Sequence, residues 1–176
     1  MTKPLGRILV LSSAVLVLAA SPVAATTITY SLSMTGAQEV PAAGDPDGLA
    51  TGTITINDSS GLISWSITYS GIATPLAAMH IHGPVGPVGV AAGVFVGLGV
   101  ATTGGPGTLI SSVTTTVANA TAINAIPTNF YVNIHNGPFP GGAVRGQLGT
   151  VVPEPGTLGL LGVGLAALVW AGRRRA

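Results

Sequence analysis

The chain has 176 residues, of which only 6% are charged and none is cysteine. The absence of cysteine excludes disulfides, thiolate metal sites and cysteine nucleophiles. Five of the six basic residues lie within seven residues of either end, and the part between Thr26 and Thr150 has one arginine against four acidic residues, a formal charge of −3 with neutral histidines. Nucleic acid is therefore excluded as a partner, because binding to phosphates requires clustered Lys and Arg.

Residues 1–25 have the pattern of a secretory signal peptide. Lys3 and Arg7 precede an apolar run over 8–20, and small residues follow up to Ala25. The run has about 13 residues, fewer than the ~20 that a membrane-spanning helix requires. We therefore predict that signal peptidase cleaves after Ala25 and that the exported domain begins at Thr26.

Residues 26–150 show the two-residue period of β-strands. Over residues 28–34, apolar side chains alternate with Thr and Ser. Tyr30 lies in the middle of this apolar set. The same alternation holds over residues 63–69, where Trp65 is on the apolar side and is therefore expected to be buried. Further strands are predicted over 51–56, 76–82, 94–98, 109–113, 130–135 and 143–148, and a single helix over 117–126, which Pro127 ends. Many short strands separated by Gly/Pro turns predict an all-β fold, an antiparallel sandwich or barrel.

Residues 151–176 form a three-part C-terminal segment. It begins with Val152, Pro153, Glu154 and Pro155, continues with an apolar stretch over 158–170, and ends with three arginines at 173–175. As a helix the apolar stretch would be only roughly 20 Å long, against a hydrocarbon core of ~30 Å. The arginines are expected to stay cytoplasmic.

This segment resembles the PEP-CTERM class of sorting signals. The resemblance implies transient inner-membrane anchoring through the C-terminal helix, recognition by an exosortase-type protease, and release to the cell surface or the extracellular space. The alternative is a permanent single-pass anchor, with bilayer thinning to fit the short helix. Together with the leader, the tail predicts hydrophobic helices at both termini.

Five short blocks give the central domain a family resemblance. They are Gly-Ala-Gln-Glu-Val-Pro at 36–41, Ala-Thr-Gly at 50–52, His-Ile-His-Gly at 80–83, Tyr-Val-Asn-Ile-His at 131–135 and Arg-Gly-Gln-Leu at 145–148. In this order they resemble the CHRD domain, the module named after chordin, over residues 30–148. The resemblance implies an immunoglobulin-like or dismutase-like β fold in an extracellular protein, with no established catalytic activity.

The three histidines of the chain are the candidate metal ligands. His80 and His82 are two apart on a predicted strand and therefore point to the same side. If the strand of His135 lay beside theirs, three imidazoles could converge on Zn or Cu, with Glu39 as a fourth ligand. The other interpretation is a structural, hydrogen-bonding role at the end of a sheet. The sequence favours this second interpretation, so no cofactor is expected, with Zn or Cu as the alternative.

Arg145 is the single cation of the central domain and Glu39 its single glutamate. Because the domain has so few charges, we predict that they form a structural ion pair, or that Arg145 ties loop carbonyls and stabilises the ends of the barrel. A role for Arg145 in binding a carboxylate or a sugar is the alternative.

Three function classes follow from these features. The first is a non-enzymatic β domain at a bacterial surface or in its matrix, with signal peptidase and the exosortase as processing partners and extracellular polysaccharide or surface proteins as ligands. The second is a metal-binding module using the three histidines. The third is an unrecognised hydrolase, the weakest of the three because no nucleophile motif is present.

Overall fold

The computed structural model describes residues 26–85, 89–100, 107–153 and 162–165. The predicted cleavage position at Ala25 lies outside this part of the chain, as do Glu154, Pro155 and most of both predicted terminal helices. Val152 and Pro153 are described and exposed. Among the described helices, none is long and apolar enough to span a bilayer.

The predicted strands and helix are all present, with bounds that differ from the prediction by at most two residues. The strands are β1 (Thr27–Thr35), β2 (Leu49–Asn57), β3 (Leu62–Ser70), β4 (Leu76–His82), β5 (Val94–Gly97), β6 (Thr108–Thr114), β7 (Tyr131–Asn136) and β8 (Val144–Gln147), and the helix is α1 (Val117–Ala125). The structure adds elements that the sequence pattern did not predict: β9 (Thr150–Val151) and the 3-10 turns η1 (Gly36–Gln38) and η2 (Pro127–Asn129).

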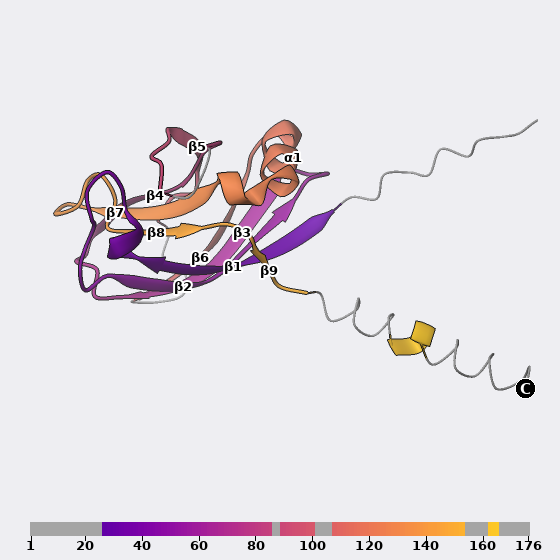
Figure 1. Cartoon of the computed structure of the whole chain (residues 1–176), viewed down its shortest axis with the longest axis horizontal. Helices are drawn as coiled ribbons and strands as arrows, with labels where there is room; N and C mark the ends of the chain where they lie inside the picture. Colours follow the sequence, from indigo (N-terminus) through magenta and orange to yellow (C-terminus); the bar gives the residue numbers. More distant parts are fainter. Residues whose placement is uncertain (1–25, 86–88, 101–106, 154–161, 166–176) are drawn as a thin grey trace, which may run out of the picture.

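The strands form one antiparallel sheet in the order β5-β4-β7-β8-β1-β2-β3-β6, with β9 paired to β1. Figure 1 shows this sheet curled into a half-barrel, with α1 at one end. The all-β prediction is confirmed. All the strands of the described residues, and the core that they bury, lie between residues 27 and 151.

The core lies inside the curl because apolar residues occupy alternate positions on nearly every strand. Trp65 is 3% exposed, which confirms its predicted burial. Helix α1 begins at Thr116, whose side chain accepts a hydrogen bond from Asn119 N. Its Ala120 and Ile123 complete the core. The other buried side chains include Tyr30, Leu32, Met34, Ile54, Ile56, Ile63, Ile67, Met79, Ile81, Val132, Ile134 and Val144.

The opposite face of β4, β7 and β8 is polar, yet most of it is buried. Tyr131, Asn133 and Arg145 on this face are each 2–3% exposed. Loops cover them: Asp45 N donates to the Ala143 carbonyl, holding the chain after η1 against the chain before β8. Burying polar groups is costly unless they find partners, so these side chains need contacts within the protein.

Candidate functional site

His80, His82 and His135 converge on the polar face. Strand β4 pairs with β7, with Ala78 opposite His135 and His80 opposite Asn133, so the three imidazoles project to the same side. Each histidine offers one ring nitrogen, and these nitrogens lie within 4.8 Å of one another. We refer to these three residues as the histidine cluster.

Two backbone carbonyls orient the cluster. His82 Nδ1 lies 2.9 Å from the Ala92 oxygen, and His135 Nδ1 lies 3.0 Å from the Pro140 oxygen. A carbonyl oxygen only accepts, so Nδ1 of both rings carries the proton and Nε2 carries the lone pair. His135 Nε2 lies 3.1 Å from His80 Nδ1 and accepts its hydrogen bond. His82 Nε2 is buried and has no hydrogen-bond partner among the described residues.

Two of the three imidazoles, His80 and His135, have lowered pKa values, which favours their neutral form. Burial lowers the pKa of the His80 imidazole, and the neighbouring His135 and His82 lower it further. Burial also lowers the pKa of His135, against the raising effect of the Pro140 carbonyl and together with a lowering effect of His82. Neutral imidazole is the form that binds transition metals, so these shifts favour ligand chemistry near neutral pH.

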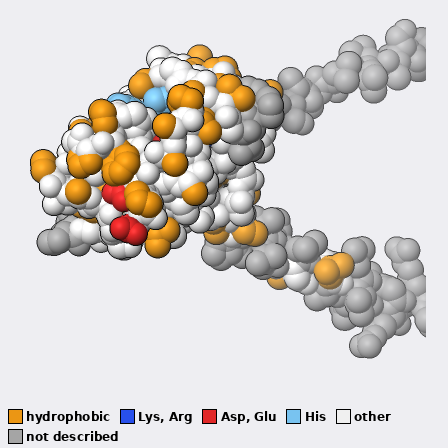
Figure 2. Space-filling model, turned by 60° about the vertical axis from the view of Figure 1, so that its left-hand side comes forward, with side chains coloured by type: hydrophobic (Ala, Val, Ile, Leu, Met, Phe, Trp, Pro, Cys, Tyr) orange, Lys and Arg blue, Asp and Glu red, His pale blue; other side chains and the backbone are white. Residues whose placement is uncertain are grey.

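The cluster reaches the surface through His80. This side chain is half-buried, whereas His82 and His135 are 7% and 9% exposed. Figure 2 shows histidine atoms at the surface of the domain, with hydrophobic and acidic side chains elsewhere on the same face. The arrangement places two of the imidazoles inside the protein and one at its boundary with solvent.

Tyr131 connects the histidine cluster to the deeper polar groups. Its ring stacks on His82 with centroids 5.0 Å apart and an interplanar angle of 10°. The Arg145 guanidinium carbon lies 3.5 Å from the centroid of the same ring. Arg145 also donates to Gln147 Oε1 at 3.3 Å, and the Tyr131 hydroxyl accepts from Ala92 N at 3.0 Å. Tyr131 therefore holds the His82 ring by stacking, and it also holds the loop of Ala92, whose carbonyl orients the His82 ring.

Glu39 belongs to the Arg145 side of this layer and not to the histidine cluster. Burial raises the pKa of its carboxyl to about 7, although Arg145 and a hydrogen bond from Asn133 both lower it. The ligand atoms that come together are those of the histidines, so a role for Glu39 as fourth ligand does not fit the geometry.

Arg145 lies close enough to Glu39 to lower the pKa of its carboxyl. Within the described residues, Glu39 Oε1 and one Arg145 terminal nitrogen have no hydrogen-bond partner. The Arg145 charge is instead shared between the Tyr131 ring and the Gln147 amide. Direct pairing of Glu39 with Arg145 stays a prediction.

Sequence reasoning did not single out Tyr131, Asn133 or Gln147 as part of the site. A signal for them was present: Tyr131, Asn133 and His135 alternate with Val132 and Ile134, so the polar residues of this strand share one face. The orienting carbonyls of Ala92 and Pro140 have no sequence signal, because any residue supplies a carbonyl.

Comparison with known proteins gives the chain its family. The CHRD domain model matches residues 30–148 and the PEP-CTERM protein-sorting motif matches residues 151–175. No curated protein and no solved structure matches the chain. The sorting motif implies export, C-terminal membrane anchoring before processing, and processing by an exosortase-type system. The chain therefore belongs to the CHRD domain family and carries a PEP-CTERM sorting motif at its C-terminus.

Proposed function

We propose that the processed protein is a non-enzymatic domain of the cell surface or extracellular matrix, and that it binds one transition metal ion, Zn or Cu, at His80, His82 and His135. The observation that carries this proposal is the convergence of three ring nitrogens within 4.8 Å, two of them on rings oriented by backbone carbonyls. Metal-binding histidines commonly donate their other ring N–H to a carbonyl or carboxylate, which fixes the tautomer and the ring orientation.

A purely structural role of the three histidines explains fewer of their contacts than a metal site does. It explains the contact between His80 and His135, but it leaves His82 Nε2 buried with no partner in the described structure. An unpaired buried acceptor costs about 1–3 kcal/mol. A metal ion would use this lone pair. If the His80 proton sat on Nε2 in place of Nδ1, all three rings would turn a lone pair toward the ion without any change in net charge.

The donor set narrows the choice of metal. Three neutral imidazoles and no thiolate or carboxylate suit Zn and Cu better than Ca or Mg, which require oxygen ligands. Three ligands leave one tetrahedral position for water or another small molecule. A non-enzymatic role is supported by the two matching families, neither of which is an enzyme family.

The proposal is tested by titrating protein spanning residues 26–153, stripped with chelator, with Zn²⁺ and with Cu²⁺ in a calorimeter. We expect one equivalent to bind and the melting temperature to rise, since binding to the folded state alone contributes about 2.7 kcal/mol at a hundredfold excess over Kd. His82→Ala should abolish both effects. Thr121→Ala, exposed on α1, is the matched control. A histidine cluster with a structural role predicts no heat of binding and destabilisation by His82→Ala alone.

The processing steps are part of the same proposal. Signal peptidase is expected to cut after Ala25 and the exosortase near Pro153, leaving the domain without Glu154, Pro155 and the arginines at 173–175. Turnover of a substrate by the metal-loaded protein would favour the hydrolase alternative. Under the proposed function, no such turnover is expected.

A further inference from the structure

A second surface, far in sequence from the histidines, has a regular chemical pattern. Strands β1, β2, β3 and β6 are adjacent, and their outward positions align in three rows of four. The central row consists of Ser31, Thr53, Ser66 and Ile110, and the rows on either side have Ser or Thr at all four positions. None of these side chains is buried. We call this surface the hydroxyl face.

The hydroxyl face has no formal charge. Strands β1, β2, β3 and β6 contain no Asp, Glu, Lys, Arg or His. An acidic polymer would require cations on this surface, and a protein partner would require the apolar centre that interfaces possess. Ile110, 43% exposed, is the one large apolar side chain among the twelve aligned positions. The surface therefore suits an uncharged partner that is itself rich in hydroxyls.

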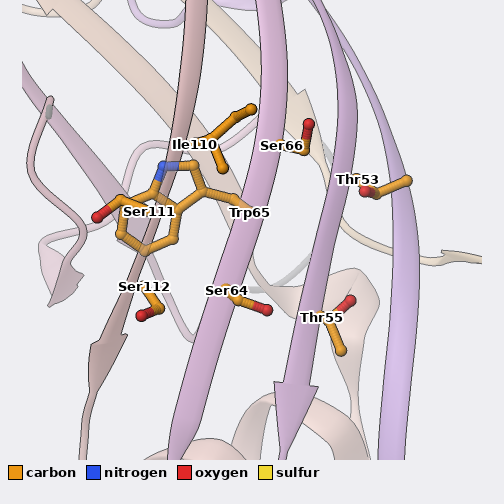
Figure 3. A pocket seen from close by; sticks show the side chains of 8 residues that line it. All are labelled: Thr53, Thr55, Ser64, Trp65, Ser66, Ile110, Ser111 and Ser112. Carbon is orange, nitrogen blue, oxygen red and sulfur yellow. The ribbon is translucent and has the colours of Figure 1, made fainter. Parts of the chain in front are cut away.

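A shallow groove of about 530 Å³ runs over β2, β3 and β6 on this face. Figure 3 shows the side chains around it; those at outward positions are Thr53, Thr55, Ser64, Ser66, Ile110 and Ser112. Thr55 shares a hydrogen bond with Thr29 at 2.9 Å. Within the described residues, the hydroxyls of Thr53, Ser64, Ser66 and Ser112 form no hydrogen bond, so they are available to a ligand.

We propose that the hydroxyl face binds a neutral polysaccharide, one chain of which lies in the groove. Neighbouring strands are ~4.8 Å apart and alternate residues along a strand ~6.8 Å apart, so the hydroxyls form a regular two-dimensional array. Each hydroxyl donates one hydrogen bond and accepts two, as sugar hydroxyls do. Ile110 and the threonine methyl groups provide apolar contact for the C–H faces of the sugar rings.

The proposal is tested with protein spanning residues 26–153, by co-sedimentation with insoluble cellulose, chitin and curdlan and by affinity electrophoresis in dextran and galactomannan. Alginate is the acidic comparison. We expect retention on at least one neutral polymer, with and without EDTA, because the groove lies on strands that do not contain the histidines. Ser66→Arg, which places a long charged side chain in the groove, should weaken retention at least tenfold.

Two further variants keep the test independent of folding. Thr53→Val with Ser66→Ala removes hydroxyls while preserving the strand, and should also weaken retention; Thr121→Arg, exposed on α1, should leave it unchanged. Far-ultraviolet circular dichroism checks that each variant is folded. Retention by alginate alone, retention by none of the neutral polymers, or neutral retention that Ser66→Arg leaves unchanged would overturn the proposal. So would a dimer that Ser66→Arg dissociates, since the face would then bind a second copy.

Discussion

The imidazoles of His80 and His135 meet across β4 and β7 with 3.1 Å between Nδ1 of one and Nε2 of the other, although the residues are 55 positions apart in the sequence. Two ring nitrogens approach this closely when one donates to the other or when both face a shared ion. His82 Nε2 completes the cluster without a partner of its own among the described residues. The chemistry of the site thus depends on strand pairing that brings distant residues together.

Processing is the first testable consequence of the sorting motif. The intact mass of the exported protein should correspond to a chain that begins near Thr26 and ends near Pro153. The physical reason is that an apolar segment of roughly 20 Å is short for a bilayer and suits transient anchoring. A mature species that retains the arginines at 173–175 would instead indicate a permanent anchor.

Trp65 should be a major contributor to stability. It is 3% exposed and packs in the core, so Trp65→Ala should lower the free energy of unfolding by roughly 3–5 kcal/mol in urea denaturation. Its indole Nε1 is buried without a hydrogen-bond partner in the described structure. Trp65→Phe, which removes this donor and keeps most of the apolar volume, should therefore cost much less. Equal losses in the two variants would mean that the buried ring volume at this position is not what stabilises the domain.

Glu39 should make stability depend on pH near neutrality. Because its folded pKa is raised to about 7 from 4.5, the folded state keeps a proton between these values that the unfolded state has lost. Its contribution to stability is thus full below about pH 4.5 and lost as the pH rises through 7, by roughly 2–3 kcal/mol. Glu39→Gln lacks this loss, so its stability relative to the unmodified protein should increase between pH 4.5 and pH 8.

Urea denaturation of both proteins at pH 4.5, 6 and 8 measures this difference. The histidines are present in both proteins, so their effect on stability cancels in the comparison. A constant difference across the three pH values would mean that folding does not shift the pKa of the Glu39 carboxyl.

Gly142 should be required for the loop beside Glu39. Its φ of +143° is one that residues with a side chain rarely adopt, and a Cβ at this position would overlap the Glu39 carboxylate. Gly142→Ala should therefore lower the free energy of unfolding by about 1–3 kcal/mol. Gly141→Ala is the matched control, because a Cβ there would meet nothing within 4 Å. Similar effects of both substitutions on the melting temperature would show that the loop rearranges freely.

The strands could be predicted because alternation of apolar and polar residues is a local signal. It located β1 and β3 through Tyr30 and Trp65, but it did not locate β9, which has two residues and no period of its own. The alternation also placed His80 and His82 on one face. It did not say whether β7 lies beside β4, because β5, β6 and α1 intervene in the sequence.

The surroundings of the site depend on packing that has no local pattern. The position of Arg145 over Tyr131 follows from the pairing of β7 with β8, which aligns Asn133 with Arg145. The loop carbonyls of Ala92 and Pro140 reach the histidines only once their loops are folded. These orienting contacts cannot be predicted from the sequence, which leaves both a structural role and a metal-binding role open for the histidines.

X-ray absorption spectroscopy of the Zn-loaded protein spanning residues 26–153 tests the metal site most directly. We predict one zinc per chain, coordinated by three imidazole nitrogens at about 2.0–2.1 Å and by one exchangeable ligand such as water. His82→Ala should remove this spectrum. Zinc coordinated mainly by oxygen atoms, or a spectrum unchanged in His82→Ala, would contradict the assignment of His80, His82 and His135 as the ligands.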